Sequence, residues 1–158
     1  MDYYNAAQGG IIDLKHEGQN TGAAEGDVYV SIAAIRGTRQ DDDIRGNEWA
    51  NRLRGSGGDD RIIGREGNDT LHGDHGEDTL WGGTGDDLLY GGAMADRFFF
   101  KPGDDGDVVK DFEDDIDIGS VKTDITDTSI WNLSSVNSLN MQHEGLTFQE
   151  TLLENINE

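Results

Sequence analysis

The residues of this sequence that could do chemistry are aspartates at a fixed spacing. From 55 to 90, four nine-residue units stand end to end, with the sequences GSGGDDRII, GREGNDTLH, GDHGEDTLW and GGTGDDLLY. Each unit has Gly at positions 1 and 4, Asp at position 6 and an aliphatic residue at position 8. Asp60 and Asp78 are eighteen residues apart, as are Asp69 and Asp87. Carboxylates repeated in this way are suited to binding a hard metal cation.

The spacing predicts a coil of alternating loops and strands. The first six residues of a unit are rich in Gly, so they can turn through positive φ. The next three form a short strand in which position 8 faces inward while positions 7 and 9 face outward. Two units close one coil, so loops on the same edge recur every eighteen residues. This arrangement stacks Asp60 over Asp78 on one edge and Asp69 over Asp87 on the other, with a cation between them.

Calcium is the cation that these loops suit best. It takes roughly six to eight oxygen ligands from carboxylates and backbone carbonyls in flexible geometry, whereas magnesium demands a stricter octahedron. A tight glycine loop turns its carbonyls toward one point. Zinc prefers Cys or His, which the units do not supply at any regular place.

The repeats resemble the RTX (repeats-in-toxin) calcium-binding nonapeptide-repeat family. The resemblance covers roughly residues 26 to 118 and is most specific in 55 to 90. It implies an all-β fold, a right-handed parallel β-roll with N- and C-terminal capping segments, and Ca²⁺ as the bound ion. It also implies secretion to the extracellular space by a type I exporter, which recognises an uncleaved C-terminal segment and passes the chain unfolded. We expect the chain to be a monomer.

The predicted site residues fall into complete and half-complete units. The complete units contribute Asp60, Asp69, Asp78 and Asp87, with the loop glycines Gly55, Gly58, Gly64, Gly67, Gly73, Gly76, Gly82, Gly83 and Gly85. Two ions therefore rest on complete motifs. Half-complete units add Asp42, Asn51, Asp96 and Asp105, which we expect to bind at lower affinity.

The register extends beyond the complete units on both sides. Toward the N-terminus it adds Ile35, Ile44 and Leu53 to the inward column, although Gln40 and Trp49 replace the fourth Gly of their units. Toward the C-terminus Asp96 and Phe98 keep register while Met94 replaces that Gly. A strict repeat would then place Asp107 inward, so we expect the frame to slip by two residues, with Asp107 and Val109 taking over from Asp105.

The two ends carry weaker patterns. Val28, Val30 and Ile32 alternate in a way that predicts a half-buried strand, and GLTFQETLLENINE predicts a short strand followed by a helical turn. We therefore divide the chain into an N-terminal strand and cap (1–45), the β-roll (46–107), and a C-terminal cap with a possible secretion segment (108–158).

The composition of the sequence limits the classes of binding partner that the chain can have. The 158 residues suit one domain, and 34% hydrophobic content is low for a large packed core. The formal net charge of -21 argues against nucleic acid and anionic membrane surfaces and for cations. There is no Cys, so disulfides are excluded. No stretch reaches the length of a transmembrane helix, and the first residues lack the basic start and apolar run of a cleaved signal.

The sequence predicts no enzyme. His72 occupies outward position 9 and His75 lies inside a loop, while HExxH, G-x-S-x-G and a Cys nucleophile are all lacking. RTX modules are often appended to proteases, lipases, epimerases or toxins, and none of those catalytic parts is found here.

We predict a calcium-binding module that folds on binding calcium outside the cell and supports the secretion and stability of a type I-secreted protein. The alternative is a carbohydrate-binding or surface-adhesion module, like the R-modules of alginate epimerases. An outward aromatic stripe would support it, and position 9 places Ile63, Trp81 and Phe99 on one sheet, with His72 and Tyr90 on the other. The charge opposes it, because alginate is a polyanion and the roll has few exposed Arg or Lys. We favour covering of the stripe by apolar residues of the tail, namely Trp131, Leu133, Leu146 and Phe148.

Overall fold

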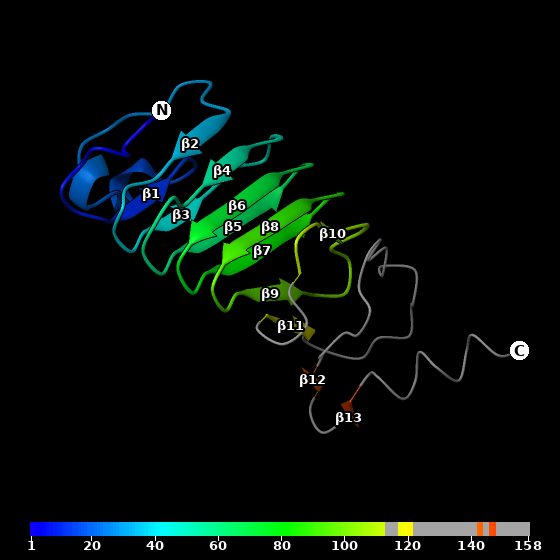
Figure 1. The fold of residues 1–158 in the computed structure, drawn as a ribbon. Coiled ribbons are helices and arrows are strands. Elements are labelled where there is room, and N and C mark those ends of the chain that lie inside the picture. The colour runs from blue at the N-terminus through cyan, green and yellow to red at the C-terminus, as the bar shows by residue number, and fades with distance from the viewer. Residues whose placement is uncertain (113–116, 122–141, 144–145, 148–158) are drawn as a thin grey trace, which may run out of the picture.

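The computed structural model describes residues 1–112, 117–121, 142–143 and 146–147, and its architecture is a β-solenoid of two parallel sheets (Figure 1). The six-stranded sheet contains, in order, β1 (Ile11–Asp13), β3 (Asp43–Arg45), β5 (Arg61–Glu66), β7 (Thr79–Thr84), β9 (Arg97–Phe100) and β11 (Ile118–Val121). The five-stranded sheet contains β2 (Ala34–Arg36), β4 (Arg52–Arg54), β6 (Thr70–His75), β8 (Leu88–Ala93) and β10 (Val108–Val109). Successive strands from β2 to β9 alternate between the two sheets, so the predicted parallel β-roll is confirmed.

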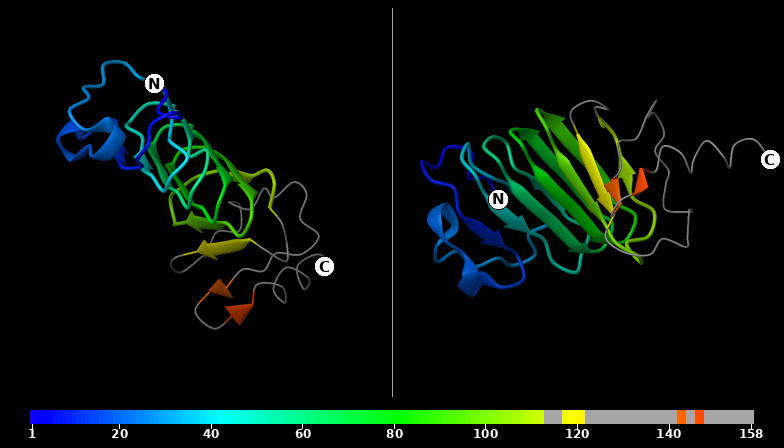
Figure 2. Two further views of the ribbon diagram at one scale, coloured as in Figure 1. Left: turned by 60° about the vertical axis from the view of Figure 1, so that its left-hand side comes forward. Right: turned by 90° about the horizontal axis from the view of Figure 1, so that it is seen from below.

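The strands pair at the predicted interval of one coil. Ile62 lies opposite Leu80 in the six-stranded sheet, and Leu71 lies opposite Leu89 in the five-stranded sheet. The coils therefore stack in a single row, with the N-terminal turns at one end, as the two views of Figure 2 show.

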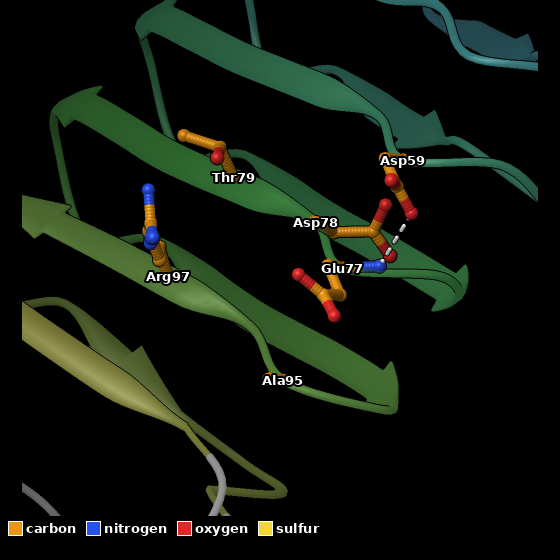
Figure 3. A pocket seen from close by; sticks show the side chains of 6 residues that line it. All are labelled: Asp59, Glu77, Asp78, Thr79, Ala95 and Arg97. Carbon is orange, nitrogen blue, oxygen red and sulfur yellow. Dashed lines mark hydrogen bonds between the residues drawn. The ribbon is translucent and has the colours of Figure 1, made fainter.

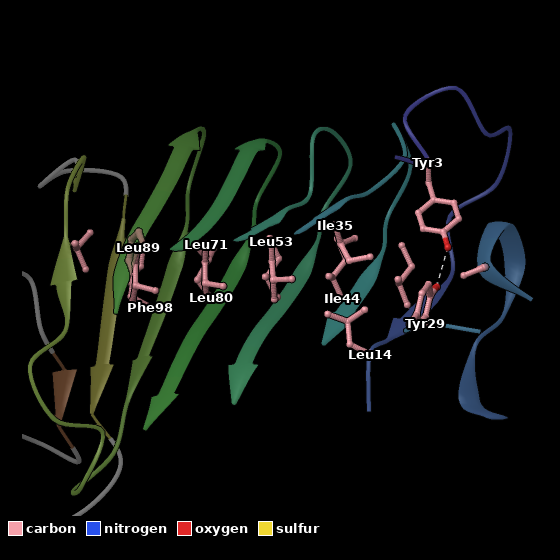
Figure 4. Packing of buried hydrophobic residues seen from close by; sticks show 14 of the residues in the cluster. Tyr3, Leu14, Tyr29, Ile35, Ile44, Leu53, Leu71, Leu80, Leu89 and Phe98 are labelled. Carbon is pink, nitrogen blue, oxygen red and sulfur yellow. Dashed lines mark hydrogen bonds between the residues drawn. The ribbon is translucent and has the colours of Figure 1, made fainter. Parts of the chain in front are cut away.

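The core is one column of inward side chains between the two sheets (Figure 4). Every predicted member is at most 2% exposed, namely Ile35, Ile44, Leu53, Ile62, Leu71, Leu80, Leu89 and Phe98. Ile12 and Val109 extend the column at its two ends. One buried aliphatic side chain contributes about 1.5–3 kcal/mol, which is less than the conformational entropy lost by fixing a nine-residue unit. The loops must therefore supply part of the stability.

The strand predicted around Val28, Val30 and Ile32 is wrong. Val28 and Val30 are 68% and 77% exposed, and the strand β2 begins only at Ala34. Tyr29, between the two valines, is buried instead, with its hydroxyl 2.8 Å from that of Tyr3. The edge of β2 is already occupied by the N-terminal residues, because Asp2 bridges to Arg36, so the segment before β2 has no strand to pair with.

Two short 3₁₀ turns, η1 (Glu17–Gln19) and η2 (Gly22–Ala24), follow β1 and lie at the N-terminal end. Their packing beside β1 closes that end of the row of coils. The described residues contain no α-helix. Neither of their two 3₁₀ turns is long and apolar enough to cross a membrane.

At the C-terminal end the predicted two-residue slip is confirmed. Val108 and Val109 pair with Leu88 and Leu89, so the preceding loop is longer than in the regular units. Beyond β11, strands β12 (Gln142–His143) and β13 (Leu146–Thr147) pair antiparallel, which confirms the short strand predicted there. The predicted helical turn, Trp131, Leu133 and Phe148 lie outside the described residues.

Among the described residues, those that cover Trp81 belong to the long loop after β9. The indole Nε1 donates to Asp104 Oδ2 at 2.9 Å, and Lys101 Nζ lies 3.1 Å from the ring centroid. Trp81 is therefore partly covered within the molecule, by a turn close to the roll.

Candidate metal centre

Buried aspartates form two ladders, one on each loop edge of the roll. The members are at most 4% exposed, and they are Asp60, Asp78 and Asp96 on one edge and Asp69, Asp87 and Asp107 on the other. In each, Oδ1 accepts the backbone N–H of the residue at the same place one coil earlier. Asp60 N–H donates to Asp78 Oδ1 at 2.8 Å, and Asp69 N–H donates to Asp87 Oδ1 at 2.7 Å. The ladders thus join neighbouring coils through one carboxylate oxygen.

The other carboxylate oxygen has no partner among the described residues. Within that part of the chain, Oδ2 is buried and accepts no hydrogen bond in Asp60, Asp69, Asp78, Asp87, Asp96 and Asp107. Burying an ionised oxygen without compensation is strongly unfavourable, and in proteins such a group is paired, binds a metal or takes up a proton. Six orphaned oxygens in two straight rows therefore indicate places for a positive charge.

The pKa values of these aspartates reflect the same imbalance. Burial raises the pKa of Asp60 to about 8, and the neighbouring charges of Asp78 and Asp42 act in the same direction. Burial raises the pKa of Asp69 to about 7 and that of Asp78 to about 6, against the backbone hydrogen bond that each accepts. In the absence of a cation, the folded ladders thus favour protonated carboxylates.

The pKa values of the last aspartates in the two ladders are raised as well. Burial raises the pKa of Asp96 to about 7, and the charges of Asp78 and Asp117 contribute. Burial also raises the pKa values of Asp87 and Asp107, and the Asp87 charge raises that of Asp107 further. The imbalance therefore extends past the complete units to the end of each ladder.

Glycines at positions 1 and 4 are required for different reasons. A Cβ on Gly55 would collide with Asp60 Oδ2, and one on Gly73 would collide with Asp78 Oδ2, so position 1 keeps space free beside the orphaned oxygen. Position 4 has positive φ, for example +96° at Gly58 and +134° at Gly76, which side-chain-bearing residues resist. The remaining predicted loop glycines follow the same rules, and Gly83 at position 2 also has positive φ, +110°.

Asp42 and Asn51 lie at ladder positions but present no orphaned acceptor. Asp42 Oδ1 accepts Gly10 N–H at 2.9 Å, and its Oδ2 accepts Thr38 N–H at 2.7 Å. Asn51 Oδ1 accepts Asn47 N–H at 2.9 Å, and its unpartnered atom is the donor Nδ2. Both residues are thus bonded to backbone donors in the way of a turn cap.

Asp105, in contrast to the sequence assignment, lies outside the ladder. It is exposed in the long loop with φ of +63°, and Asp107 takes its place by accepting Asp87 N–H at 3.1 Å. The extra two residues of the loop are the physical reason, because they move the inward position to Val109. Asp117 extends the other ladder, accepting Asp96 N–H at 2.9 Å.

Position 5 carries an outer ladder that the sequence argument missed. Glu77 N–H donates to Asp59 Oδ1 at 2.9 Å, and Asp59 N–H donates to Asp41 Oδ1 at the same distance. The signal was available, because all four complete units have Asp, Asn or Glu at position 5. A pocket of about 150 Å³ opens here (Figure 3), lined by Asp59, Glu77, Asp78, Thr79, Ala95 and Arg97.

The donor set fits calcium. Within the described ranges, no three acidic, His or Cys side chains converge on one point, so a site must take most of its ligands from backbone carbonyls. Glycine loops can supply those carbonyls, and calcium accepts them together with carboxylates. A zinc site with Cys or His ligands does not match this arrangement.

A parallel β-roll whose glycine loops carry orphaned carboxylates is a repeat protein built to bind cations along its edges. A family model described as the RTX calcium-binding nonapeptide repeat (4 copies) matches residues 46–80 and again 72–106. Residues 46–106 therefore carry RTX calcium-binding repeats, and repeats of this kind bind calcium ions and are generally non-catalytic. No curated protein matches the chain.

Proposed function

We propose that residues 46–107 form a module that folds on binding calcium outside the cell and supports the secretion and stability of a type I-secreted protein. Residues 1–45 would act as its N-terminal cap and 108–158 as its C-terminal cap and secretion segment. The observation that carries this proposal is the set of six buried Oδ2 atoms without a partner. The module has no catalytic role in this proposal.

The ligands follow from the ladders. Asp60 with Asp78, and Asp69 with Asp87, stand in complete loops on both sides of a site. Asp96 and Asp107 continue the two rows, each with its own orphaned oxygen. When bound, calcium would supply the positive charge that the buried carboxylates lack, and loop carbonyls would complete its coordination. Each pair of aspartates would then hold two neighbouring coils together.

The electrostatic argument explains why the chain would stay extended before export. Two carboxylates about 4 Å apart repel by ~1 kcal/mol in water and by ~4 kcal/mol at an effective dielectric constant of 20. Stacked aspartates therefore oppose coil formation at low cytosolic calcium. Because the site does not exist in the unfolded chain, the free energy of metal binding becomes free energy of folding.

Far-UV circular dichroism tests this proposal directly. The spectrum of the chain is recorded in chelator and then during a titration with calcium. A titration with magnesium at the same concentrations is the control. We expect β structure to form cooperatively with a midpoint of about 10⁻⁴ to 10⁻³ M calcium, and magnesium to be far less effective. A chain with the same β signal in chelator as in calcium would refute the mechanism.

A further inference from the structure

The last aspartate of one ladder, Asp107, is presented by a loop that differs from the regular ones. Asp107 follows Asp87 after 20 residues, whereas Asp87 follows Asp69 after 18. The loop, residues 101–107, has the sequence KPGDDGD and comes after Phe100, which stands where the nine-residue frame would place a first Gly. The glycines that shape the regular loops are therefore only partly present here, so other contacts must hold Asp107 in place.

Trp81, on the outer face of β7, supplies such a contact. Its indole Nε1 donates to Asp104 Oδ2 at 2.9 Å, and the same oxygen accepts the backbone N–H of Lys101 at 2.7 Å. Asp104 N–H donates back to Lys101 O at 3.1 Å, which closes the turn. The other complete units have Ile, His and Tyr at position 9, so only one complete unit carries an indole N–H there.

The face of the Trp81 ring is also occupied by this loop. Lys101 Nζ lies 3.1 Å from the ring centroid, and a cation over an aromatic face is attracted by the ring quadrupole. The loop is thus held to Trp81 at the edge of the ring through Asp104 and at its face through Lys101. We call Trp81, Lys101 and Asp104 the clamp.

Two further contacts continue from the clamp to the ladder. Gly106 N–H donates to Asp86 Oδ1, and Asp87 N–H donates to Asp107 Oδ1, both at 3.1 Å. Asp104 and Asp107 are 5% and 4% exposed, so both carboxylates are buried. In the part of the chain that the structure describes, Asp107 Oδ2 accepts no hydrogen bond. The orphaned oxygen therefore belongs to a short stretch of chain that is fixed on both sides of it.

Asp104 also places a third negative charge beside the end of this ladder. Burial is the main reason why the pKa values of Asp87 and Asp107 are raised, and the charge of Asp104 raises both further. A cation between Asp87 and Asp107 would therefore be attracted by three carboxylates. Release of the clamp would weaken that attraction in two ways, because Asp107 would lose its fixed position and Asp104 could move away.

We propose that Trp81 is the positioning residue of the last calcium site, between Asp87 and Asp107, because its indole N–H fixes the turn that presents Asp107. Trp81 contacts no ion in this arrangement and acts only through the loop. The role rests on the proposed function, since it requires calcium to be the ion that the ladders bind. The last site is then complete only when the loop is docked on the outer face of the six-stranded sheet.

The experiment counts the calcium ions bound to the full chain by equilibrium dialysis, with circular dichroism of the same samples. Trp81→Phe keeps an aromatic ring beneath Lys101 and removes only the N–H donor. The matched control is Trp49→Phe, because Trp49 is 69% exposed. We expect Trp81→Phe to keep its β structure at saturating calcium and to bind one of its ions about tenfold more weakly, the factor for one hydrogen bond to a charged group. The control should bind calcium like the parent.

Asp107→Asn separates positioning of the site from general stabilisation of the roll. The amide oxygen of Asn can still accept Asp87 N–H, but the orphaned charge is gone, so this variant should bind one ion fewer. In its background Trp81→Phe should have no further effect on calcium binding, because both residues act on the same site. Asp104→Ala breaks the same hydrogen bond from the acceptor side and should reproduce the loss seen in Trp81→Phe.

The outcomes distinguish this role from the proposed function. If Trp81→Phe binds every ion as tightly as the parent, Trp81 does not position the site. An equal loss of calcium binding in the Asp107→Asn background also overturns the role, because Trp81 would then act on the roll as a whole. A parent chain that binds no calcium refutes the proposed function itself, and this role with it. If Trp81→Phe does not fold at saturating calcium, Asp104→Ala carries the same comparison.

Discussion

The N-terminal turns (37–54) and the complete repeats (55–90) share one backbone design but treat the same side-chain position differently. Both contribute fully buried residues to the inward column. In the N-terminal turns, both oxygens of Asp42 accept backbone N–H groups, whereas in the repeats Asp60 Oδ2 accepts nothing. The aspartate at position 6 is therefore a cap where backbone N–H groups donate to both of its oxygens, and a candidate calcium ligand where one oxygen accepts no hydrogen bond.

The N-terminal end also carries its own cation. Arg65 reaches from the second complete repeat to Asp13, with Nη1 2.8 Å from Oδ1 and Nη2 2.7 Å from Oδ2. Burial raises the pKa of Asp13, but hydrogen bonds from Arg65 and from the backbone of His16 and Lys15 outweigh it and lower that pKa to about 2. The guanidinium of Arg65 thus neutralises the buried carboxylate at this end, as a bound calcium ion would neutralise the carboxylates of the ladders.

The largest expected difference is between Asp78→Ala and Asp42→Ala. Asp78→Ala removes an orphaned carboxylate between two ladder partners, so we expect the calcium midpoint of folding to rise by about tenfold or more. Asp42→Ala removes a cap and no orphaned carboxylate, so we expect a loss of about 1–3 kcal/mol in stability at saturating calcium and, because folding and calcium binding are coupled, a midpoint shift smaller than that of Asp78→Ala. Calcium titration and urea unfolding of both variants measure this. Equal midpoint shifts would show that the two regions do not differ in the way described.

Arg65→Gln should weaken the N-terminal end independently of calcium. It removes both hydrogen bonds from the guanidinium to the fully buried Asp13 carboxylate and leaves Arg45 Nη1, 3.9 Å from Oδ2, as a more distant cation, so we expect a loss of up to about 3–5 kcal/mol. Arg61→Gln is the matched control, because Arg61 pairs with Asp43 at the surface, where such pairs contribute about 0–1 kcal/mol. Urea unfolding at saturating calcium compares the two. Similar losses for both variants would contradict the internal-cation role of Arg65.

The effect of pH should reverse sign between calcium-free and calcium-loaded samples. The folded pKa values of Asp60, Asp69 and Asp96 are raised to about 8, 7 and 7, above the unfolded value of roughly 3.9. Without cations, the contribution of these three aspartates to stability is therefore fully present below about pH 4 and is lost as pH rises toward 8. With calcium, protons compete for the same oxygens, so affinity falls as pH falls. Circular dichroism across this range, in metal-stripped and in calcium buffers, measures both trends; parallel trends would refute the assignment.

The smallest expected effect is at Met94, where the fifth unit lacks its loop glycine. Met94 has φ of +86° and is 60% exposed, so its side chain gains little from burial. Met94→Gly should stabilise the calcium-loaded chain by up to about 1 kcal/mol, and Gly76→Ala, at φ of +134°, should destabilise it. Thermal unfolding at fixed calcium compares them. A destabilised Met94→Gly would mean that this loop is held by contacts of the methionine.

The sequence predicted those features of the fold that follow from the nine-residue repeat itself. Position 8 of each unit defined the inward column, and the conflict at Asp107 exposed the slip in frame, because both follow from period and polarity within a few residues. The Arg65 contact could not be predicted, since Asp13 lies 52 residues away and its position depends on how the segment before β2 folds. The caps on Asp42 were hidden for the same reason, because one donor is Gly10.

The carbohydrate alternative shows a different limit of the sequence. Arg and Lys are too few to suggest a binding surface when they are counted along the chain. The eighteen-residue spacing puts Arg36 and Arg54 in the column of His72 and Tyr90, and the strand register shows the same column. Lys110 joins it after the longer loop, through its N–H bond to Leu89 O. Composition gives the total charge, but the fold decides where that charge is placed.

The alternation of units between the two edges restricts how such a chain can change length in evolution. Inserting or deleting one unit would move every later unit to the opposite edge, so that the C-terminal strands β10 and β11 would each meet the wrong sheet. A change of eighteen residues keeps β8 beneath β10 and β9 beneath β11, as they pair now. Duplication should therefore have proceeded by whole coils, and an engineered roll should tolerate the gain or loss of a pair of units better than that of one.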